Sequence, residues 1–352
     1  MSMRKQQQGS HTIYIACEGA VSEKEYFEAI RDEVQELWDV YIDIYPKNAQ
    51  SPNDAMSLVS LAQKKTAKFK EVWAVFDKDG DVPTAALNEA TIVKNGKIVN
   101  IGYSSIAFEH WVLLHFEKNN TAFLKSDCKE EATEDHFYCG RPGDDHPEDC
   151  RGLRCAANRV RENYISEYNK KGGFNLYSQI KHRNERVLEN AAWLRHRMGS
   201  DIEAVNNAEI NPYTNLDILL RRLHNNTEKI FWGNLNQTYS NGDIDISVSY
   251  TAPLIIITLI NNGVDRFFLN HNEKDYFFLS NDEGEIGELE FVDSEIINNT
   301  STHAVKTAKT LSFFQNDTVV IRFNSIPSIQ FPLYLNFKQN GIRNMFNLSE
   351  AG

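Results

Sequence analysis

Two groups of acidic side chains in the first half of the chain have the residue types and spacing for metal-assisted phosphoryl chemistry. Glu18 directly follows one short apolar run, and Asp77, Asp79 and Asp81 directly follow another. Mg²⁺ prefers carboxylate oxygens and usually keeps several waters, so two or three carboxylates and a substrate phosphate suffice to bind it. Such an ion polarises the phosphate and activates water. We therefore expect these four residues to hold Mg²⁺ or Mn²⁺.

The aspartate-rich segment that begins at Asp77 has three other interpretations. Asp and Gly are ordinary turn formers, so a plain polar turn is one alternative. A calcium-binding EF-hand loop needs Gly at its sixth place and Glu at its twelfth, where this chain has Val82 and Asn88. The haloacid-dehalogenase phosphatases carry a similar motif whose first Asp is a nucleophile. They place it on the first strand and follow its Gly with Thr or Val, whereas Asp81 follows here, so a phosphatase is a minor alternative.

Alternating strand and helix patterns over the first 120 residues position these carboxylates. Short apolar runs predict strands over 12–17, 40–45, 71–76 and 97–103. Helical spacing predicts helices that begin near 22, 51 and 108, the first with Ser22 as N-cap of a capping box completed by Glu25. This alternation predicts βαβ units and an α/β fold with a mainly parallel sheet flanked by helices. Sites in such sheets form at the carboxyl ends of the strands, so Glu18 and Asp77 should meet.

Two further residues, Glu109 and His115, lie in the third predicted helix, 108–116. They are six residues apart and do not share a helix face, so they are not a chelating pair. We expect Glu109 to add a metal ligand or to interact favourably with the helix dipole. His115 is either a packed, hydrogen-bonded core residue or a proton donor or phosphate contact beside the carboxylates.

A polar insertion at residues 119–156 holds four of the five cysteines of the chain, namely Cys128, Cys139, Cys150 and Cys155. In a reducing compartment, four soft ligands could bind a structural zinc ion and fasten a loop that has no core. Their spacings lack the usual Cys-x-x-Cys pair, which favours free thiols over zinc, with a disulfide as the third alternative.

The segment 151–198 is basic, although the chain as a whole carries a net charge of -12. It has eleven Lys or Arg against four Glu, a local charge of +7, with aromatic residues between them. Such a face suits contact with a phosphate backbone and stacking of bases, the alternative being a solvated helical face balanced by acidic neighbours. The residues expected to bind nucleic acid are Lys78, Arg151, Arg154, Arg159, Lys181, Arg183 and Arg186.

The last third of the chain has a different character. Short apolar runs between Asn- and Asp-rich turns predict an antiparallel β-sandwich, and hence two domains, 1–228 and 229–352. Residues 231–352 contain 14 acidic and 7 basic side chains, which disfavours binding of a polyanion. The plainest roles for this region are oligomerisation and recognition of a protein.

Composition sets the limits for these interpretations. With 41% hydrophobic and 24% charged residues, the 352-residue chain can bury sizeable cores and is not disordered. No apolar run reaches 18 residues, so we expect no membrane span. The polar N-terminus lacks a signal-peptide pattern, and an odd number of cysteines indicates reduced thiols, so we expect a cytoplasmic protein.

Three ordered blocks of the chain resemble the RloB-like family, a branch of the Toprim proteins associated with bacterial phage-defence loci. The blocks are Glu18–Phe27, Val75–Asp79 and Ser104–Phe116, and the resemblance covers roughly residues 10–225. It implies a Toprim fold, Glu18 as general acid or base, and Asp77 and Asp79 as Mg²⁺ ligands. It also implies cleavage of nucleic acid and an ATPase partner of the AAA or ABC type. The cysteine-rich insertion and the C-terminal β region are not recognised family features.

The sequence thus predicts a Mg²⁺-dependent Toprim-type nuclease that cleaves RNA, such as tRNA, or DNA in defence against phage. Asp77 and Asp79 hold the metal, Glu18 transfers a proton, Asp81 or Glu109 assists, and Lys78 contacts phosphate. The alternative is a non-catalytic regulatory subunit that docks on an ATPase and senses a viral trigger protein. The choice of RNA or DNA, the trigger, the ligand of the β region and the oligomeric state are left open.

Overall fold

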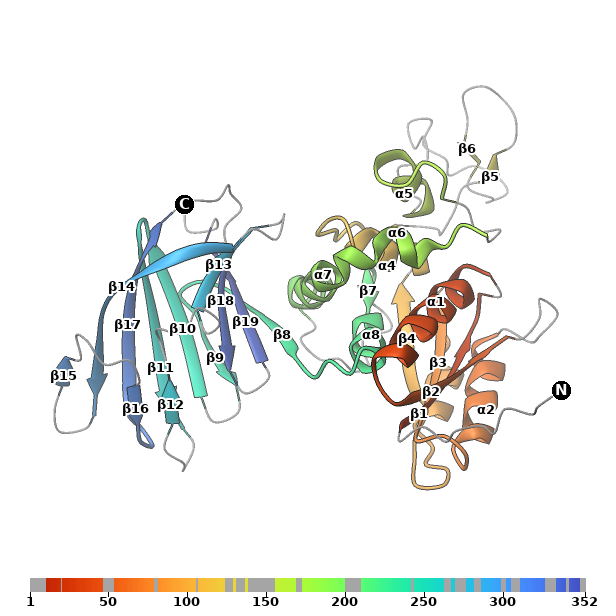
Figure 1. Cartoon of the computed structure of the whole chain (residues 1–352), viewed down its shortest axis with the longest axis horizontal. Coiled ribbons are helices and arrows are strands. Elements are labelled where there is room, and N and C mark those ends of the chain that lie inside the picture. Colours follow the sequence, from red (N-terminus) through yellow and green to blue (C-terminus); the bar gives the residue numbers. More distant parts are fainter. Residues whose placement is uncertain are drawn as a thin grey trace. The chain divides into compact units, whose positions relative to one another are not determined.

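The chain forms two compact units, Met1–Thr227 and Glu228–Gly352, in a computed structural model (Figure 1). The structure describes residues 11–19, 21–46, 54–78, 82–105, 107–123, 129–130, 137–138, 156–168, 173–199, 210–241, 244–262, 267–269, 277–281, 286–298, 302–304, 311–326, 334–339 and 342–348. Each unit has a hydrophobic core of its own.

A five-stranded sheet of order β2-β1-β3-β4-β7 forms the centre of the first unit. Its strands are β1 (His11–Cys17), β2 (Val40–Tyr45), β3 (Glu71–Asp77), β4 (Asn100–Ser105) and β7 (Tyr213–Thr214). The first four run parallel, and β7 is antiparallel to β4. The predicted mainly parallel sheet is therefore confirmed, although β4 begins at residue 100 and not at 97.

Helices cover both faces of this sheet. They are α1 (Ser22–Leu37), α2 (Ala55–Lys65), α3 (Thr84–Ala90), α4 (Phe108–Leu114), α5 (Ala156–Asn163), α6 (Leu176–Ile180), α7 (Asn184–Arg197) and α8 (Leu216–Leu223), with a 3₁₀ turn η1 (Lys181–Arg183) before α7. Helices α2 and α3 share a core cluster with one face of β1 and β3, and α8 lies against the opposite face. A Cβ atom at Gly102 would come within 2.9 Å of Leu216 Cδ2, so this glycine allows α8 to approach β4. Cover on both faces explains why β1 and β3 are apolar almost throughout.

Helix α1 begins at Ser22, at the predicted position, but its N-terminal cap differs from the prediction. Val21 is the N-cap of α1, and no side chain caps the helix. The expected capping box of Ser22 and Glu25 is therefore wrong. The hydroxyl of Ser22 instead bonds to Tyr168, and Glu25 accepts two hydrogen bonds from the backbone N–H of Gly173, so tertiary contacts take both side chains.

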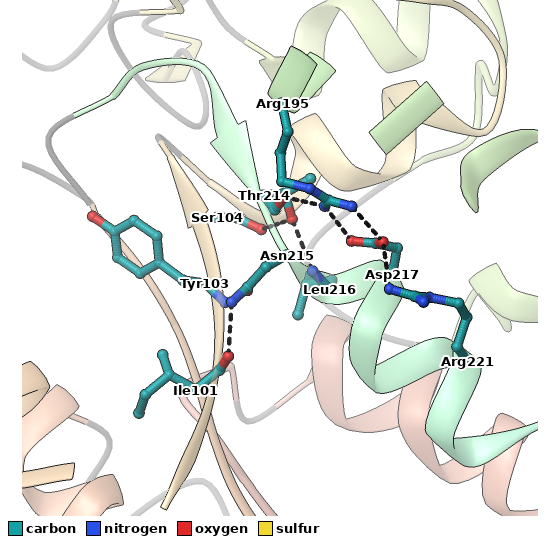
Figure 2. Close-up of polar contacts among 9 residues, drawn as sticks. All are labelled: Ile101, Tyr103, Ser104, Arg195, Thr214, Asn215, Leu216, Asp217 and Arg221. Atoms are coloured by element: carbon teal, nitrogen blue, oxygen red, sulfur yellow. Dashed lines mark hydrogen bonds and ion pairs between the residues drawn. The ribbon is translucent and has the colours of Figure 1, made fainter. Parts of the chain in front are cut away.

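Asn215 connects the start of α8 to the middle of β4 (Figure 2). Its Oδ1 accepts from the N–H of Tyr103 at 2.7 Å, and its Nδ2 donates to the carbonyl of Ile101 at 3.0 Å. Beside it, the hydroxyls of Thr214 and Ser104 lie 3.2 Å apart. The Asn215 side chain thus continues the pairing of β4 where the short strand β7 has ended.

We expect Asn215→Ala to lower the free energy of unfolding of the first unit by about 2–3 kcal/mol, because it leaves a buried N–H and a buried C=O without these partners. Urea unfolding followed by circular dichroism measures the change. Asn163→Ala is the control, since the amide of Asn163 is exposed and donates to Arg159 O at 3.2 Å. Its effect should stay within about 0.5 kcal/mol. Equal effects of the two substitutions would contradict the role given to Asn215.

The second unit is built of antiparallel β-sheets. Its strands are β8 (Lys229–Gly233), β9 (Thr238–Asn241), β10 (Ile244–Thr251), β11 (Leu254–Asn261), β12 (Phe267–Leu269), β13 (Phe277–Ser280), β14 (Ile286–Ile297), β15 (Thr302–Ala304), β16 (Leu311–Phe313), β17 (Thr318–Ile326), β18 (Tyr334–Gln339) and β19 (Ile342–Asn347). The main sheet has the order β8-β19-β18-β13-β14-β17-β11-β10-β9, and among its described strands only β8 and β19 pair in parallel. Alternate residues of β10 and β11 are buried in the core.

The short strands β5 (Lys129–Glu130) and β6 (Phe137–Tyr138) pair antiparallel within the predicted insertion. Among the described residues, no helix has the length and apolar character needed to cross a lipid bilayer.

Candidate functional site

The ends of β1 and β3 bring Glu18 and Asp77 together. Cys17 pairs with Val75 across the two strands, and the next residue, Glu18, donates its N–H to the carbonyl of Val75 at 2.9 Å. The side chain of Glu18 then turns across the strand end, where Oε2 accepts from the N–H of Asp77 at 3.0 Å. These two residues therefore meet at the carboxyl edge of the sheet, as the parallel strands require.

Helix α4 adds Glu109 to the same edge. Its first residue, Phe108, donates its backbone N–H to Oδ2 of Asp77 at 2.9 Å. The Asp77 carboxylate is therefore fastened to the beginning of α4, and Glu109 is the next residue along the chain. The Glu109 side chain is buried, and its Oε1 accepts a hydrogen bond from the hydroxyl of Tyr168 at 2.8 Å.

Glu23, in the first turn of α1, supplies a fourth carboxylate that the sequence did not mark as a site residue. Its carboxyl group lies directly over Gly19, so that a Cβ atom placed on Gly19 would overlap Glu23 Oε2 at 1.4 Å. Glycine at this position leaves room for the Glu23 side chain to fold back toward the end of β1. The glycine that follows Glu18 was therefore the available signal in the sequence.

The negative charges of this group act on Asp77. Burial is the largest cause that raises the pKa of Asp77 well above its ordinary value, followed by the charges of Glu23 and Glu109 and, more weakly, Glu18. The hydrogen bond from Phe108 opposes the shift. We call Glu18, Glu23, Asp77 and Glu109 the carboxylate cluster. Excess negative charge on hard oxygen donors is the chemistry that suits a divalent cation such as Mg²⁺.

The structure describes only two of the four predicted metal ligands, Glu18 and Asp77. Among the residues that the structure describes, no set of three or more His, Cys, Asp or Glu side chains is arranged to hold a metal ion. Asp79 and Asp81 lie outside the described residues. The ligand roles of Glu18, Asp77, Asp79 and Asp81 stay predictions, supported by the donor chemistry of the cluster.

His115 lies in the core of the first unit. Its Nδ1 is 3.1 Å from Trp111 O, and its ring contacts those of Trp111 and Tyr26 edge-on. Burial lowers the pKa of His115 to about 3, which keeps the imidazole neutral. These contacts favour the packed-core interpretation over that of a proton donor.

Acidic or aromatic groups engage several of the basic residues predicted to bind nucleic acid. Arg159 forms an ion pair with Glu117 at 3.1 Å, and Lys181 forms one with Glu33 at 2.7 Å. The Arg183 guanidinium lies 4.9 Å from the centre of the Phe116 ring. These contacts order the basic side chains on α5 and η1 and neutralise part of their charge.

The remaining members of the predicted face lie in different settings. Arg186 is partly exposed on α7, and Lys78 donates its N–H to Ser104 O at 3.0 Å beside the carboxylate cluster. Arg151 and Arg154 lie outside the described residues, as do Cys128, Cys139, Cys150 and Cys155, the predicted zinc ligands. The fifth cysteine, Cys17, is buried and donates to Tyr45 O at 3.1 Å.

Comparison with known proteins identifies the family of this chain. Residues 13–223 match the RloB-like protein family, a span of more than half of the 352 residues. The chain belongs to the RloB-like family. This confirms the resemblance seen in the three sequence blocks. The RloB-like match includes the whole carboxylate cluster and the basic segment 151–198, and it ends before the second unit begins.

The comparisons add no close relative to the RloB-like assignment. No curated protein matches the chain significantly. One similar solved structure is an uncharacterised β-sandwich protein from Clostridium difficile 630, with 10% identity over 34% of this chain and 95% of that one, at a TM-score of 0.23. Another is KdgF from Halomonas sp., with 7% identity over 26% of this chain and 89% of that one, at a TM-score of 0.14.

Proposed function

We propose that this RloB-like protein is a Mg²⁺-dependent nuclease of the Toprim type that cleaves nucleic acid, RNA such as tRNA or DNA, in defence against phage. The observation that carries the proposal is the carboxylate cluster at the carboxyl edge of a parallel sheet. Glu18 and Asp77 lie at the ends of different strands, and the Asp77 N–H donates to Glu18 Oε2 at 3.0 Å. Structural carboxylates are commonly paired with cations, whereas burial and the charges of Glu23 and Glu109 raise the pKa of Asp77, a pattern common at functional sites.

The residues of this edge suit a divalent ion. Asp77 and Asp79 would hold it, with Asp81 or Glu109 assisting, and Mn²⁺ would serve as well as Mg²⁺. When bound, the ion supplies positive charge that stabilises the negative charge developing on the scissile phosphate. Glu18 transfers a proton to or from the attacking or leaving oxygen. The Asp77 N–H, which donates to Glu18 Oε2, orients that carboxylate.

The basic segment would guide the substrate. Its exposed cations contact the phosphate backbone, and Tyr164, stacked on Phe116 with ring centres 4.5 Å apart, adds an aromatic surface beside Arg183. The second unit is proposed to be a β-sandwich that recognises a viral trigger protein or a second copy of the chain. An ATPase of the AAA or ABC type is the proposed partner.

The test of this function is cleavage of end-labelled tRNA, single-stranded DNA and duplex DNA with Mg²⁺, with Mn²⁺ and with EDTA. We expect Glu18→Gln to reduce the cleavage rate by about 10²–10⁴-fold, because it removes a general acid or base. The folded structure should be retained, since the Gln carbonyl can still accept from the Asp77 N–H. Glu28→Gln is the matched control, because Glu28 lies on the outside of α1 in ion pairs with Lys24 and Arg31.

Three outcomes would reject the proposed mechanism. Full metal-dependent activity of the Glu18→Gln variant would show that Glu18 is not the general acid or base. Absence of cleavage by the wild-type protein, both alone and together with the ATPase, favours the regulatory subunit that docks on that ATPase. Turnover of a small phosphoester with a trapped aspartyl-phosphate on Asp77 would favour a phosphatase.

A further inference from the structure

Tyr168, in the connection that follows α5, contacts the carboxylate cluster. The connection follows α5 in the basic segment, and at Tyr168 it reaches Glu109, 59 residues earlier in the chain, through a hydrogen bond of 2.8 Å. Beyond Tyr168, the N–H of Gly173 donates to both carboxylate oxygens of Glu25 on α1, at 3.0 and 2.9 Å. The connection is therefore fastened to α4 at one point and to α1 at another.

Tyr168 and Glu109 form a buried pair. Their exposed fractions are 2% and 1%. A tyrosine hydroxyl that donates to a carboxylate forms a charge-assisted bond, which is shorter and stronger than a bond between neutral groups. The same hydroxyl bonds to Ser22 at the start of α1, one residue before Glu23. The Tyr168 hydroxyl thus bonds directly to one carboxylate of the cluster, and the charge of a second, Glu23, also acts on it.

The direction of the Glu109 side chain depends on this bond. Phe108 is held on Asp77 through its N–H, so the backbone at Glu109 is fixed against the cluster. The side chain can still rotate about its own bonds, and the hydrogen bond from the Tyr168 hydroxyl to Oε1 favours one orientation. Phenylalanine would fill the same space without the donor.

We infer that Tyr168 is a positioning residue that holds the Glu109 carboxylate in place for the divalent ion of the proposed nuclease site. This role rests on the proposed function, because it concerns the same site. It also connects the site with its proposed substrate, since Tyr168 lies in the connection that follows α5, the helix that carries Arg159 and Arg161. Nucleic acid that engages α5 would act on metal binding through the Tyr168–Glu109 bond.

Titration of the metal-free, full-length protein with Mn²⁺ alone, followed by calorimetry, tests this inference without an activity assay. We expect Tyr168→Phe to weaken Mn²⁺ binding by about 10–100-fold, the usual effect of removing a hydrogen bond that orients a metal ligand. We expect Glu109→Gln to weaken binding as well. Adding Tyr168→Phe to Glu109→Gln should then change the affinity less than twofold, because the two residues act as a unit.

Tyr164→Phe is the matched control. Tyr164 lies four residues before Tyr168, and its hydroxyl also donates to a carboxylate, that of Glu117, which is outside the cluster and is bound by Arg159. This variant should bind Mn²⁺ within twofold of the wild type. Wild-type affinity in Tyr168→Phe, or equal weakening in both Tyr variants, would overturn the positioning role alone. Failure of the wild-type protein itself to bind Mn²⁺ would overturn the proposed function and this role with it.

Discussion

Asp77→Asn is expected to abolish metal-dependent cleavage and, in metal-free buffer at neutral pH, to raise the melting temperature of the first unit. Both effects have the same cause. Burial and the charges of Glu23 and Glu109 disfavour the ionised Asp77 carboxylate in the folded protein. Asn keeps an oxygen that can accept from the Phe108 N–H but removes the charge. The variant therefore loses a metal ligand and also loses an electrostatic penalty that the metal-free protein carries.

The pH dependence of this stabilisation has a definite sign. The pKa of Asp77 in the folded protein is raised, whereas in the unfolded chain it is about 3.9. Between these two values the folded state binds more protons, so the stability of the wild type falls as pH rises. The advantage of Asp77→Asn should be absent near pH 4 and grow toward neutral pH, by about 1.4 kcal/mol for each pKa unit that separates the two states.

Thermal unfolding in EDTA between pH 4 and pH 7.5 measures the difference between Asp77→Asn and the wild type. Asp32→Asn is the control, because the Asp32 side chain is 69% exposed and pairs with Arg31 on the surface of α1. Its effect should stay within about 0.5 kcal/mol at every pH. A lower melting temperature for Asp77→Asn at neutral pH would show that the cluster is not electrostatically strained.

Local sequence patterns predict the sheet of the first unit, but they miss some of the strands of the second unit. Strands buried on both faces give continuous apolar runs, and the predicted strand 40–45 matches β2 at both ends. The strand β19 was not predicted, although it lies between β8 and β18. Its buried residues include Asn344, whose amide donates to Phe337 O at 3.3 Å. When a strand buries amide side chains that are hydrogen-bonded to the neighbouring strand, its sequence does not alternate between apolar and polar residues. Such a strand cannot be predicted from that alternation.

The candidate site was predictable where it depends on strand ends and not where it depends on tertiary contacts. Glu18 and Asp77 each terminate an apolar run, so parallel pairing alone brings them together. Glu23 joins them because α1 starts close behind β1 and Gly19 leaves space. Tyr168 reaches Glu109 from a connection whose path no local pattern determines. Sequence spacing therefore predicts the residues held by the sheet, and packing decides the rest.

Arg195→Met should cause the largest loss of stability among the substitutions considered, about 3–5 kcal/mol, because it leaves a buried carboxylate without its main partner. Arg195 donates to both oxygens of Asp217, at 2.6 and 2.8 Å, and also to Thr214 O at 3.1 Å (Figure 2). The two side chains are 5% and 3% exposed. In the variant, Asp217 keeps the longer contact to Arg221 at 3.4 Å, which cannot replace two direct bonds.

Urea unfolding at neutral pH measures this loss, and Arg222→Met is the matched control. Arg222 pairs with Glu71, but its side chain is 49% exposed, so its removal should cost no more than about 1 kcal/mol. The double variant Arg195→Met with Asp217→Leu should recover part of the stability, because it removes the buried, unpaired carboxylate, whereas Arg221, 8% exposed, loses its contact with Asp217. A double variant as unstable as Arg195→Met would assign the loss to packing and not to charge.

The pH dependence of stability is a second way to distinguish a lost charge interaction from a packing defect in Arg195→Met. Burial acts to raise the pKa of Asp217, but Arg195 and Arg221 hold it below its ordinary value. The wild-type pair therefore contributes its stability above the unfolded-state pKa of about 3.9 and loses it as pH falls through the lower folded value. Without Arg195, burial dominates and the pKa of Asp217 rises, so the variant gains by taking up a proton as the pH falls. The difference between the two proteins should narrow on acidification, whereas a packing defect would be independent of pH.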